Sequence, residues 1–143
     1  MQAAYWRASG EPVRQVTDLL DKCVEMGLTV VRMWAFFNEP TDDRDQRGTP
    51  KALEYQPGVY NEDFLWGLDY VISEAGKRDI KLLPVLTNYQ KEYGGMRQYA
   101  NWALRRTNLR SEDFYTSPDA IRMFENHVRK IVTRRNSITG VNY

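Results

Sequence analysis

The sequence predicts an α/β fold built around a parallel sheet. Two observations predict it: short apolar runs rich in β-forming residues, and amphipathic stretches of helical spacing that alternate with them. The expected order is strand, helix, strand, helix, strand, helix, helix, which calls for parallel strands joined by right-handed crossovers. A closed (β/α)8 TIM barrel needs about 250 residues, so a chain of this length would hold a partial barrel of roughly three of the eight βα units. An open, doubly wound sheet is the alternative.

The first elements are expected between residues 3 and 37. Residues 3–7 should end a strand, and Pro12 fits the first turn of a helix that Gly27 stops. The apolar face of this helix is expected from recurring aliphatic residues and one cysteine (Val13, Val16, Leu19, Leu20, Cys23 and Val24). The strand that follows, LTVVRMWAFF at residues 28–37, has the composition of a strand buried on both faces, although Arg32 lies in its middle. Arg32 and Trp34 are two residues apart and therefore project to the same side.

The middle of the chain is expected to contain a loop, a helix and a third strand. Residues 38–56 are polar and rich in breakers, which predicts a long surface loop ending at a Pro57-Gly58 turn. Asn61 can cap a helix that ends at Gly76. Residues 80–86, IKLLPVL, read as a strand, although Pro84 removes a ladder donor.

The last part of the chain is expected to be mainly helical. A loop at 87–95 precedes a helix at about 96–104, and residues 107–116 are expected to be irregular. Ser117 and Pro118 start a final helix by supplying a capping side chain and a first-turn proline. The terminal SITGVNY suggests no closing element.

Composition narrows the possible partners. A net charge of +1 argues against a nucleic-acid or anionic-membrane surface, and the single cysteine, Cys23, excludes an internal disulfide. No apolar run of about 18 residues predicts a transmembrane helix, and the first ten residues lack the hydrophobic core of a signal peptide. Aromatic residues make up 13% of the chain, which is common in carbohydrate-binding clefts and also in ordinary cores.

The motifs favour no cofactor or metal. There is no phosphate-binding glycine loop, and the one histidine, His127, rules out His-based metal clusters and Ser-His-Asp triads. His127 falls mid-helix, where a structural or solvated role is expected. Glu39, in Asn38-Glu39-Pro40, and Glu92 follow successive strands, and two carboxylates about 5 to 10 Å apart can hydrolyse glycosides. Both lie several residues out in loops, whereas rigid strand ends hold catalytic groups better.

Arg32 and Trp34 leave two interpretations open. A guanidinium beside an indole at the outgoing end of a strand suits a polar ligand with carboxylates or sugar rings nearby. Alternatively, the arginine is satisfied by a structural carboxylate and the tryptophan belongs to a core.

With these features in view, the chain resembles the N-terminal part of plant-type glycoside hydrolase family 5 endo-β-1,4-mannanases. The resemblance lies in the RMWAF strand, the PGVYNE helix start and the YGGMRQY loop, and it extends through NLRSEDFYTSPDAIRMFENHVRKIVTRRNSITGVNY. It implies that residues 1–143 are the N-terminal portion of a (β/α)8 catalytic barrel with a retaining, two-glutamate mechanism. It also implies that the chain stops before the fourth strand, so that both catalytic glutamates lie outside it and Glu39 is not the acid/base.

The same resemblance assigns roles to individual residues. Arg32 matches the arginine that hydrogen-bonds the nucleophile, and Trp34 matches a substrate-contacting tryptophan. Asn88 and Tyr89 match a loop where the family usually shows asparagine and tryptophan. Tyr93 would line the cleft, as would Trp102 unless it packs in a core. The implied partner is β-mannan, and the implied location is extracellular.

Three functions remain open at this point. The chain is part of a mannanase, inactive alone; or it is a non-catalytic sugar-binding or interaction module; or it is an unrelated open α/β enzyme that uses Glu39. An opened barrel leaves a strand edge unpaired and apolar surface uncovered, so we expect the isolated chain to self-associate or be partly molten.

Overall fold

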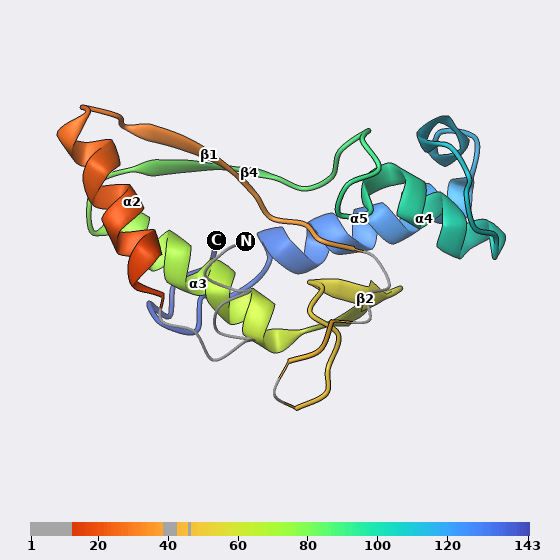
Figure 1. Ribbon diagram of the computed structural model, residues 1–143, viewed down its shortest axis with the longest axis horizontal. Coiled ribbons are helices and arrows are strands. Elements are labelled where there is room, and N and C mark those ends of the chain that lie inside the picture. Colours follow the sequence, from red (N-terminus) through yellow and green to blue (C-terminus); the bar gives the residue numbers. More distant parts are fainter. Residues whose placement is uncertain (1–12, 39–42, 46) are drawn as a thin grey trace.

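The computed structural model describes residues 13–38, 43–45 and 47–143 (Figure 1). In chain order, its elements are α2 (Arg14–Glu25), β1 (Val30–Trp34), β2 (Glu54–Gln56), β3 (Val59–Tyr60), α3 (Glu62–Gly76), β4 (Lys81–Val85), α4 (Gly95–Leu104), the 3-10 helix η1 (Ser111–Phe114) and α5 (Pro118–Val132). The strand expected at residues 3–7, the helix start at Pro12 and the candidate carboxylate of Glu39 lie outside the described residues.

The α2 helix follows the predicted spacing only in part. Its buried residues are Val16, Leu20 and Cys23, while Leu19 and Val24, which were also expected on the buried face, are exposed. The predicted stop is confirmed, because Gly27 adopts a φ of +71°. This turn leads directly into the β1 strand.

The two longer strands, β1 and β4, are parallel, as the element order predicts. Val30 lies opposite Lys81, and the register continues to Trp34 opposite Val85. Lys81 N donates to Thr29 O and Ala35 N donates to Val85 O, each at 2.8 Å. A parallel ladder uses alternate residues of a strand, so the missing donor of Pro84 lies on the edge away from β1. This explains why the proline is tolerated in β4.

Helices cover only one face of the β1–β4 pair. Figure 1 shows α2, α3 and α5 on the same side of these strands. Met33 and Ala35 pack there into a core with α3 and α5, while Val31 packs with α2. The other face, called here the open face, carries Val30, Arg32, Trp34, Leu83 and Val85. Val30 is 58% exposed and Leu83 is 56% exposed, so the prediction of a strand buried on both faces is wrong for the described structure.

The prediction of a long surface loop over residues 38–56 is wrong at both ends of that range, although the described residues between 43 and 51 form no helix or named strand. Asn38, Ala52, Leu53 and Glu54 are buried, and β2 pairs antiparallel with β3 around the predicted Pro57-Gly58 turn. The reason is a return of the chain to the end of the first strand, where Glu54 N donates to Phe37 O at 3.0 Å. Backbone pairing over this distance in sequence has no local signature.

The helix starts agree with their capping residues, and no helix or named strand follows α5, as expected for the terminal SITGVNY. Asn61 Oδ1 accepts from the second residue of α3 at 2.9 Å, and Ser117 Oγ caps α5 with Pro118 in the first turn. Residues 107–116, expected to be irregular, include η1. The terminal segment is anchored by an Arg135–Asn142 bridge and by a 2.5 Å hydrogen bond from the Tyr143 hydroxyl to Asp69. No helix in the described parts of the chain is long and apolar enough to cross a membrane.

Candidate functional site

An aromatic cluster lies where β1 and β4 end. The rings of Trp34 and Tyr93 meet edge to face with centroids 5.1 Å apart, and Phe37 meets Tyr93 in the same way at 5.2 Å. Trp34 also lies against Phe36, at 5.2 Å. Tyr93 is 42% exposed, so the cluster presents an aromatic surface to solvent at the carboxyl end of the parallel pair. Such a surface suits the apolar faces of sugar rings.

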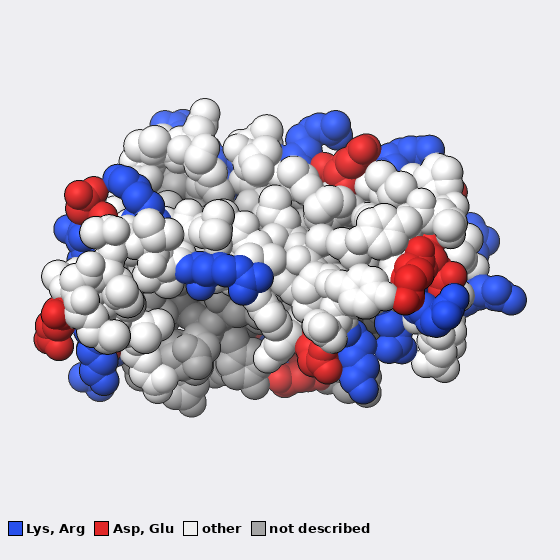
Figure 2. Space-filling view, turned by 90° about the horizontal axis from the view of Figure 1, so that it is seen from above, with Lys and Arg blue, Asp and Glu red and all other residues white. Residues whose placement is uncertain are grey.

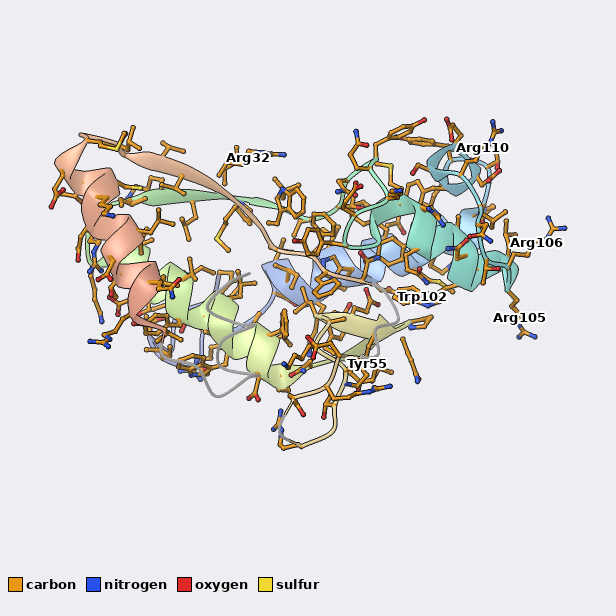
Figure 3. The ribbon with its side chains drawn as sticks, viewed as in Figure 1. Arg32, Tyr55, Trp102, Arg105, Arg106 and Arg110 are labelled. Atoms are coloured by element: carbon orange, nitrogen blue, oxygen red, sulfur yellow. The ribbon has the colours of Figure 1, made fainter. Side chains whose placement is uncertain are left out.

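Arg32 lies on the open face, one pleat before Trp34. Figure 3 shows its side chain projecting away from α2 and α3. The residue is exposed and makes no ion pair within residues 13–38, 43–45 and 47–143, so the interpretation of an arginine satisfied by a structural carboxylate finds no support there. Figure 2, which looks onto this side of the molecule, shows mainly uncharged side chains across the centre and charged ones toward the ends. Arg32 is therefore free to contact a group placed over the open face.

A buried asparagine fixes the position of Tyr93. Asn38 N donates to Tyr93 O at 3.1 Å, and its side-chain amide exchanges two hydrogen bonds with the backbone of Gly95, at 3.0 and 3.4 Å. The loop approaches so closely that a Cβ on Gly94 would lie 2.0 Å from Asn38 O. Gly94 also has a φ of +89° and Gly95 a φ of +62°. Only glycines allow this turn, which brings Tyr93 against Trp34.

The next two predicted site residues lie in the same loop but serve different contacts. Asn88 turns its amide into the loop, where Nδ2 donates to Glu92 O at 3.3 Å. Its Oδ1 is buried and makes no hydrogen bond in the described structure. Tyr89 is exposed and its hydroxyl donates to Glu112 of η1, while Ser111 Oγ donates to Tyr89 O at 2.5 Å. The bond from Tyr89 lowers the pKa of Glu112, and that carboxylate raises the pKa of Tyr89.

Trp102 does not line this site. It packs against Tyr99 of the same helix, with ring centroids 5.8 Å apart, and belongs to the core between α4, η1 and α5. Figure 3 places it on the far side of α4 from Arg32. The structure therefore brings Trp34 and Tyr93 together and places Arg32 on the same open face as Trp34. Tyr89 lies at the other side of the loop, next to η1.

Sequence reasoning missed a buried polar cluster beneath the aromatic residues. Glu54 accepts hydrogen bonds from Gly58 N at 2.8 Å and from the Tyr99 hydroxyl at 2.9 Å. His127 Nδ1 lies 3.8 Å from the same carboxylate and 3.5 Å from the Tyr60 hydroxyl. The signal that could have found Glu54 is the alternation of β-forming residues around the Pro57-Gly58 turn, which is typical of a hairpin.

Burial controls the charge of this cluster. It raises the pKa of Glu54, and it lowers the pKa of His127 to about 4. His127 is therefore neutral near pH 7, and its complete burial agrees with the structural role expected for it. Glu54, Tyr99 and His127 are all buried, so the cluster joins the β2–β3 hairpin to α4 and α5 and does not present these groups to a ligand.

The chain matches a known protein family and several curated proteins. Residues 1–143 match a family model described as GH family 5 beta-mannosidase-like. The chain is 37% identical over 147 aligned residues to mannan endo-1,4-beta-mannosidase 5 of Solanum lycopersicum, covering 98% of this chain and 33% of that protein. It thus spans about a third of the length of the curated relatives it matches.

Solved structures of mannanases are also similar to this chain. The endo-1,4-beta-mannanase of Rhizomucor miehei superposes with a TM-score of 0.77 and 28% identity, over 97% of this chain and 38% of that one. The hyperthermostable endo-1,4-beta-D-mannanase of Thermotoga petrophila superposes with a TM-score of 0.79 and 29% identity, over 93% and 38%.

Proposed function

We propose that residues 1–143 form the N-terminal portion of the catalytic barrel of an endo-β-1,4-mannanase, because this chain belongs to the GH family 5 β-mannosidase-like family. Family membership also removes the reason to consider an unrelated open α/β enzyme that uses Glu39. In this proposal the parallel β1–β4 pair is part of the barrel wall, its open face turns toward the barrel interior, and the substrate is β-mannan outside the cell.

One observation carries the proposal. Arg32 and Trp34 share the open face, and Tyr93 meets Trp34 at the carboxyl ends of the strands. Active sites of parallel barrels lie at that end, built from the loops that follow the strands. A cation beside two aromatic rings supplies both the electrostatic and the stacking contacts that a sugar-cleaving site requires.

The proposed reaction uses two glutamates with net retention. One protonates the leaving glycosidic oxygen while the other attacks the anomeric carbon, so that the C–O bond breaks as a glycosyl ester forms. Water then attacks the same carbon, gives its proton to the first glutamate and releases the sugar. We assign neither glutamate to residues 1–143. Arg32 would donate hydrogen bonds to the nucleophile and keep it ionised, and Trp34 and Tyr93 would stack on mannose rings.

A chimera tests the assignment. Residues 1–143 would replace the matching third of mannan endo-1,4-beta-mannosidase 5 of Solanum lycopersicum, and hydrolysis of galactomannan would be assayed. We expect activity in the chimera and a loss of about 10²-fold in kcat on Arg32→Ala, the usual effect of removing one electrostatic contact to a reacting group. Arg122→Ala is the matched control, because Arg122 is an exposed arginine of α5 that pairs only with Asp119 among the described residues. Equal losses in both variants would contradict the role of Arg32.

The isolated chain tests the alternative, a non-catalytic sugar-binding module. Tyr89 and Tyr93 are exposed aromatic residues, which is the feature that favours this reading. Calorimetric titration with mannohexaose distinguishes the two functions. Saturable binding by the 143-residue chain, abolished by Trp34→Ala, together with an inactive chimera would support the module.

A further inference from the structure

A concave region adjoins the aromatic cluster along the 87–95 loop, since Tyr93 and Gly94 line one of its cavities. Two adjoining cavities of about 490 and 530 Å³ open there, and they share Lys91, Glu92 and Arg97 in their walls. Both volumes fall in the usual range for ligand pockets, about 300 to 1,000 Å³. The larger cavity is completed by Tyr89 and by residues 108–111, which include Arg110.

The walls of this pocket carry a local excess of positive charge. Lys91, Arg97 and Arg110 line it together with one carboxylate, Glu92. A second carboxylate, Glu112, accepts from the Tyr89 hydroxyl and interacts electrostatically with Arg110. Arg97 hydrogen-bonds only the neutral amide oxygen of Asn108, at 3.4 Å. None of the three cations forms an ion pair within 4.0 Å in the described ranges. A guanidinium group without an ion pair, such as that of Arg97, favours an anion, and arginine binds carboxylates through two parallel hydrogen bonds.

An aromatic ring is held beside these cations. Tyr89 is 50% exposed, yet both ends of the residue are fixed, because its hydroxyl donates to Glu112 and its carbonyl accepts from Ser111 Oγ. A tyrosine restrained in this way offers a flat apolar surface at little entropic cost. The combination of a fixed ring and cationic side chains matches a sugar ring that bears a carboxylate.

We propose that this pocket binds a uronate, that is, a pyranose with a carboxylate at carbon 6. Tyr89 stacks on the ring, and Arg97 and Arg110 bind the carboxylate while Lys91 adds to the positive potential. The uronate comes either from a separate acidic polysaccharide or from an acidic side group on a neutral chain. The inference does not rest on mannan hydrolysis, so a failed chimera would leave it standing.

Titration of the full 143-residue chain with trigalacturonate tests the proposal, using NMR or calorimetry, with mannotriose as the neutral probe. We expect binding of trigalacturonate alone, weakened when ionic strength rises from about 0.01 to about 0.15 M, because the Debye length falls from ~30 to ~8 Å. Arg97→Gln and Arg110→Gln should each weaken binding by roughly threefold to tenfold, as expected for one charge-assisted hydrogen bond in an open pocket. The salt dependence of the unmodified chain tests the inference even if a variant fails to fold.

Two other arginines provide matched controls. Arg105 and Arg106 directly follow the end of α4 and lie outside both cavity walls. Their side chains point away from Arg110 in Figure 3. Arg105→Gln and Arg106→Gln should leave the affinity unchanged. Equal weakening by these controls would indicate diffuse attraction and overturn the proposal, as would equal binding of mannotriose. Displacement of trigalacturonate by inorganic phosphate at the same concentration would also overturn it, by showing a general anion site.

A further titration distinguishes the two sources of the uronate. A manno-oligosaccharide bearing one glucuronate side group would be compared with trigalacturonate under the same conditions. Tighter binding of the first would support an acidic substituent on mannan, and tighter binding of the second would support a separate acidic polysaccharide. Binding of neither would refute the pocket.

Discussion

Replacing Asp69 with asparagine should release the C-terminal segment from α3. Asp69 is fully buried and accepts from Arg134 Nε at 3.0 Å and Nη2 at 2.8 Å. It also accepts from Ser137 Oγ at 2.7 Å and from the Tyr143 hydroxyl at 2.5 Å. The asparagine keeps the size of the side chain but removes the charge that balances the guanidinium.

The magnitude follows from the geometry. Removing one partner of a buried ion pair costs about 3 to 5 kcal/mol, since the other charge is left uncompensated. The lower end applies, because Arg134 keeps 13% of its side chain exposed and has Glu62 at 3.3 Å as a second partner. About 3 kcal/mol corresponds to roughly a 100-fold increase in local opening.

Amide hydrogen exchange of residues 134–143, followed by mass spectrometry, measures this opening. Asn136, Gly140 and Tyr143 donate their amide protons to backbone carbonyls in this segment, so their exchange reports its attachment. Glu62→Gln is the matched control. Glu62 contacts the same guanidinium but is 63% exposed, and exposed pairs contribute only about 0.2 to 1 kcal/mol, at most about a fivefold change. A control that exchanges as fast as Asp69→Asn would refute the reasoning.

The attachment of the C-terminal segment to α3 should also depend on pH. Burial alone would raise the pKa of Asp69, but the bonds from Arg134, Tyr143 and Ser137 hold the pKa below its ordinary value. The carboxylate therefore stabilises the segment fully above about pH 4, its unfolded value. That contribution is lost as the pH falls through the lowered pKa.

Three further predictions concern the core, the loop and the open face. Burial lowers the pKa of His127 from about 6.5 to about 4, so only the unfolded state binds the proton between these pH values. The free energy of unfolding should therefore fall by about 3 kcal/mol as the pH drops across that interval. The midpoint of urea unfolding should lose this pH dependence in His127→Phe. Gly94→Ala should expose the 92–95 amides to exchange, because its Cβ would lie 2.0 Å from a backbone oxygen, whereas Gly76→Ala, with nothing within 4 Å, should not. Leu83→Lys should reduce concentration-dependent sedimentation of the isolated chain, and Val141→Lys, at a residue that is even more exposed but lies off the open face, should not. A compact monomer with a sharp melt in the unmodified chain would contradict the expected self-association.

Local chemistry explains which elements the sequence predicts well. Asn61 and Ser117 cap helices through hydrogen bonds within three residues, and Gly27 ends one through its own backbone conformation. Such signals act over one turn of chain, so they can be read without the fold. Arg32 and Trp34 share a face for the same reason, because side chains of a strand alternate with period two.

Contacts between distant residues explain the failures. Glu54 was assigned to a surface loop, yet it is buried, because it hydrogen-bonds Gly58, Tyr99 and the backbone of Phe37. The terminal SITGVNY was expected to supply no closing element, and it forms no helix or named strand, yet Asp69 holds this segment across more than sixty residues of sequence. Neither partner carries a local pattern that identifies the other.

The sequence by itself predicted the α/β class, the order of the main elements and the shared side of Arg32 and Trp34, because each depends on periodicity, capping or recognisable motifs. Tertiary structure decided that Tyr93 meets Trp34 while Trp102 turns into a core. It also gathered Lys91, Arg97 and Arg110 around one pocket. These arrangements arise from close packing between segments far apart in the chain, where steric fit and burial select one partner among many.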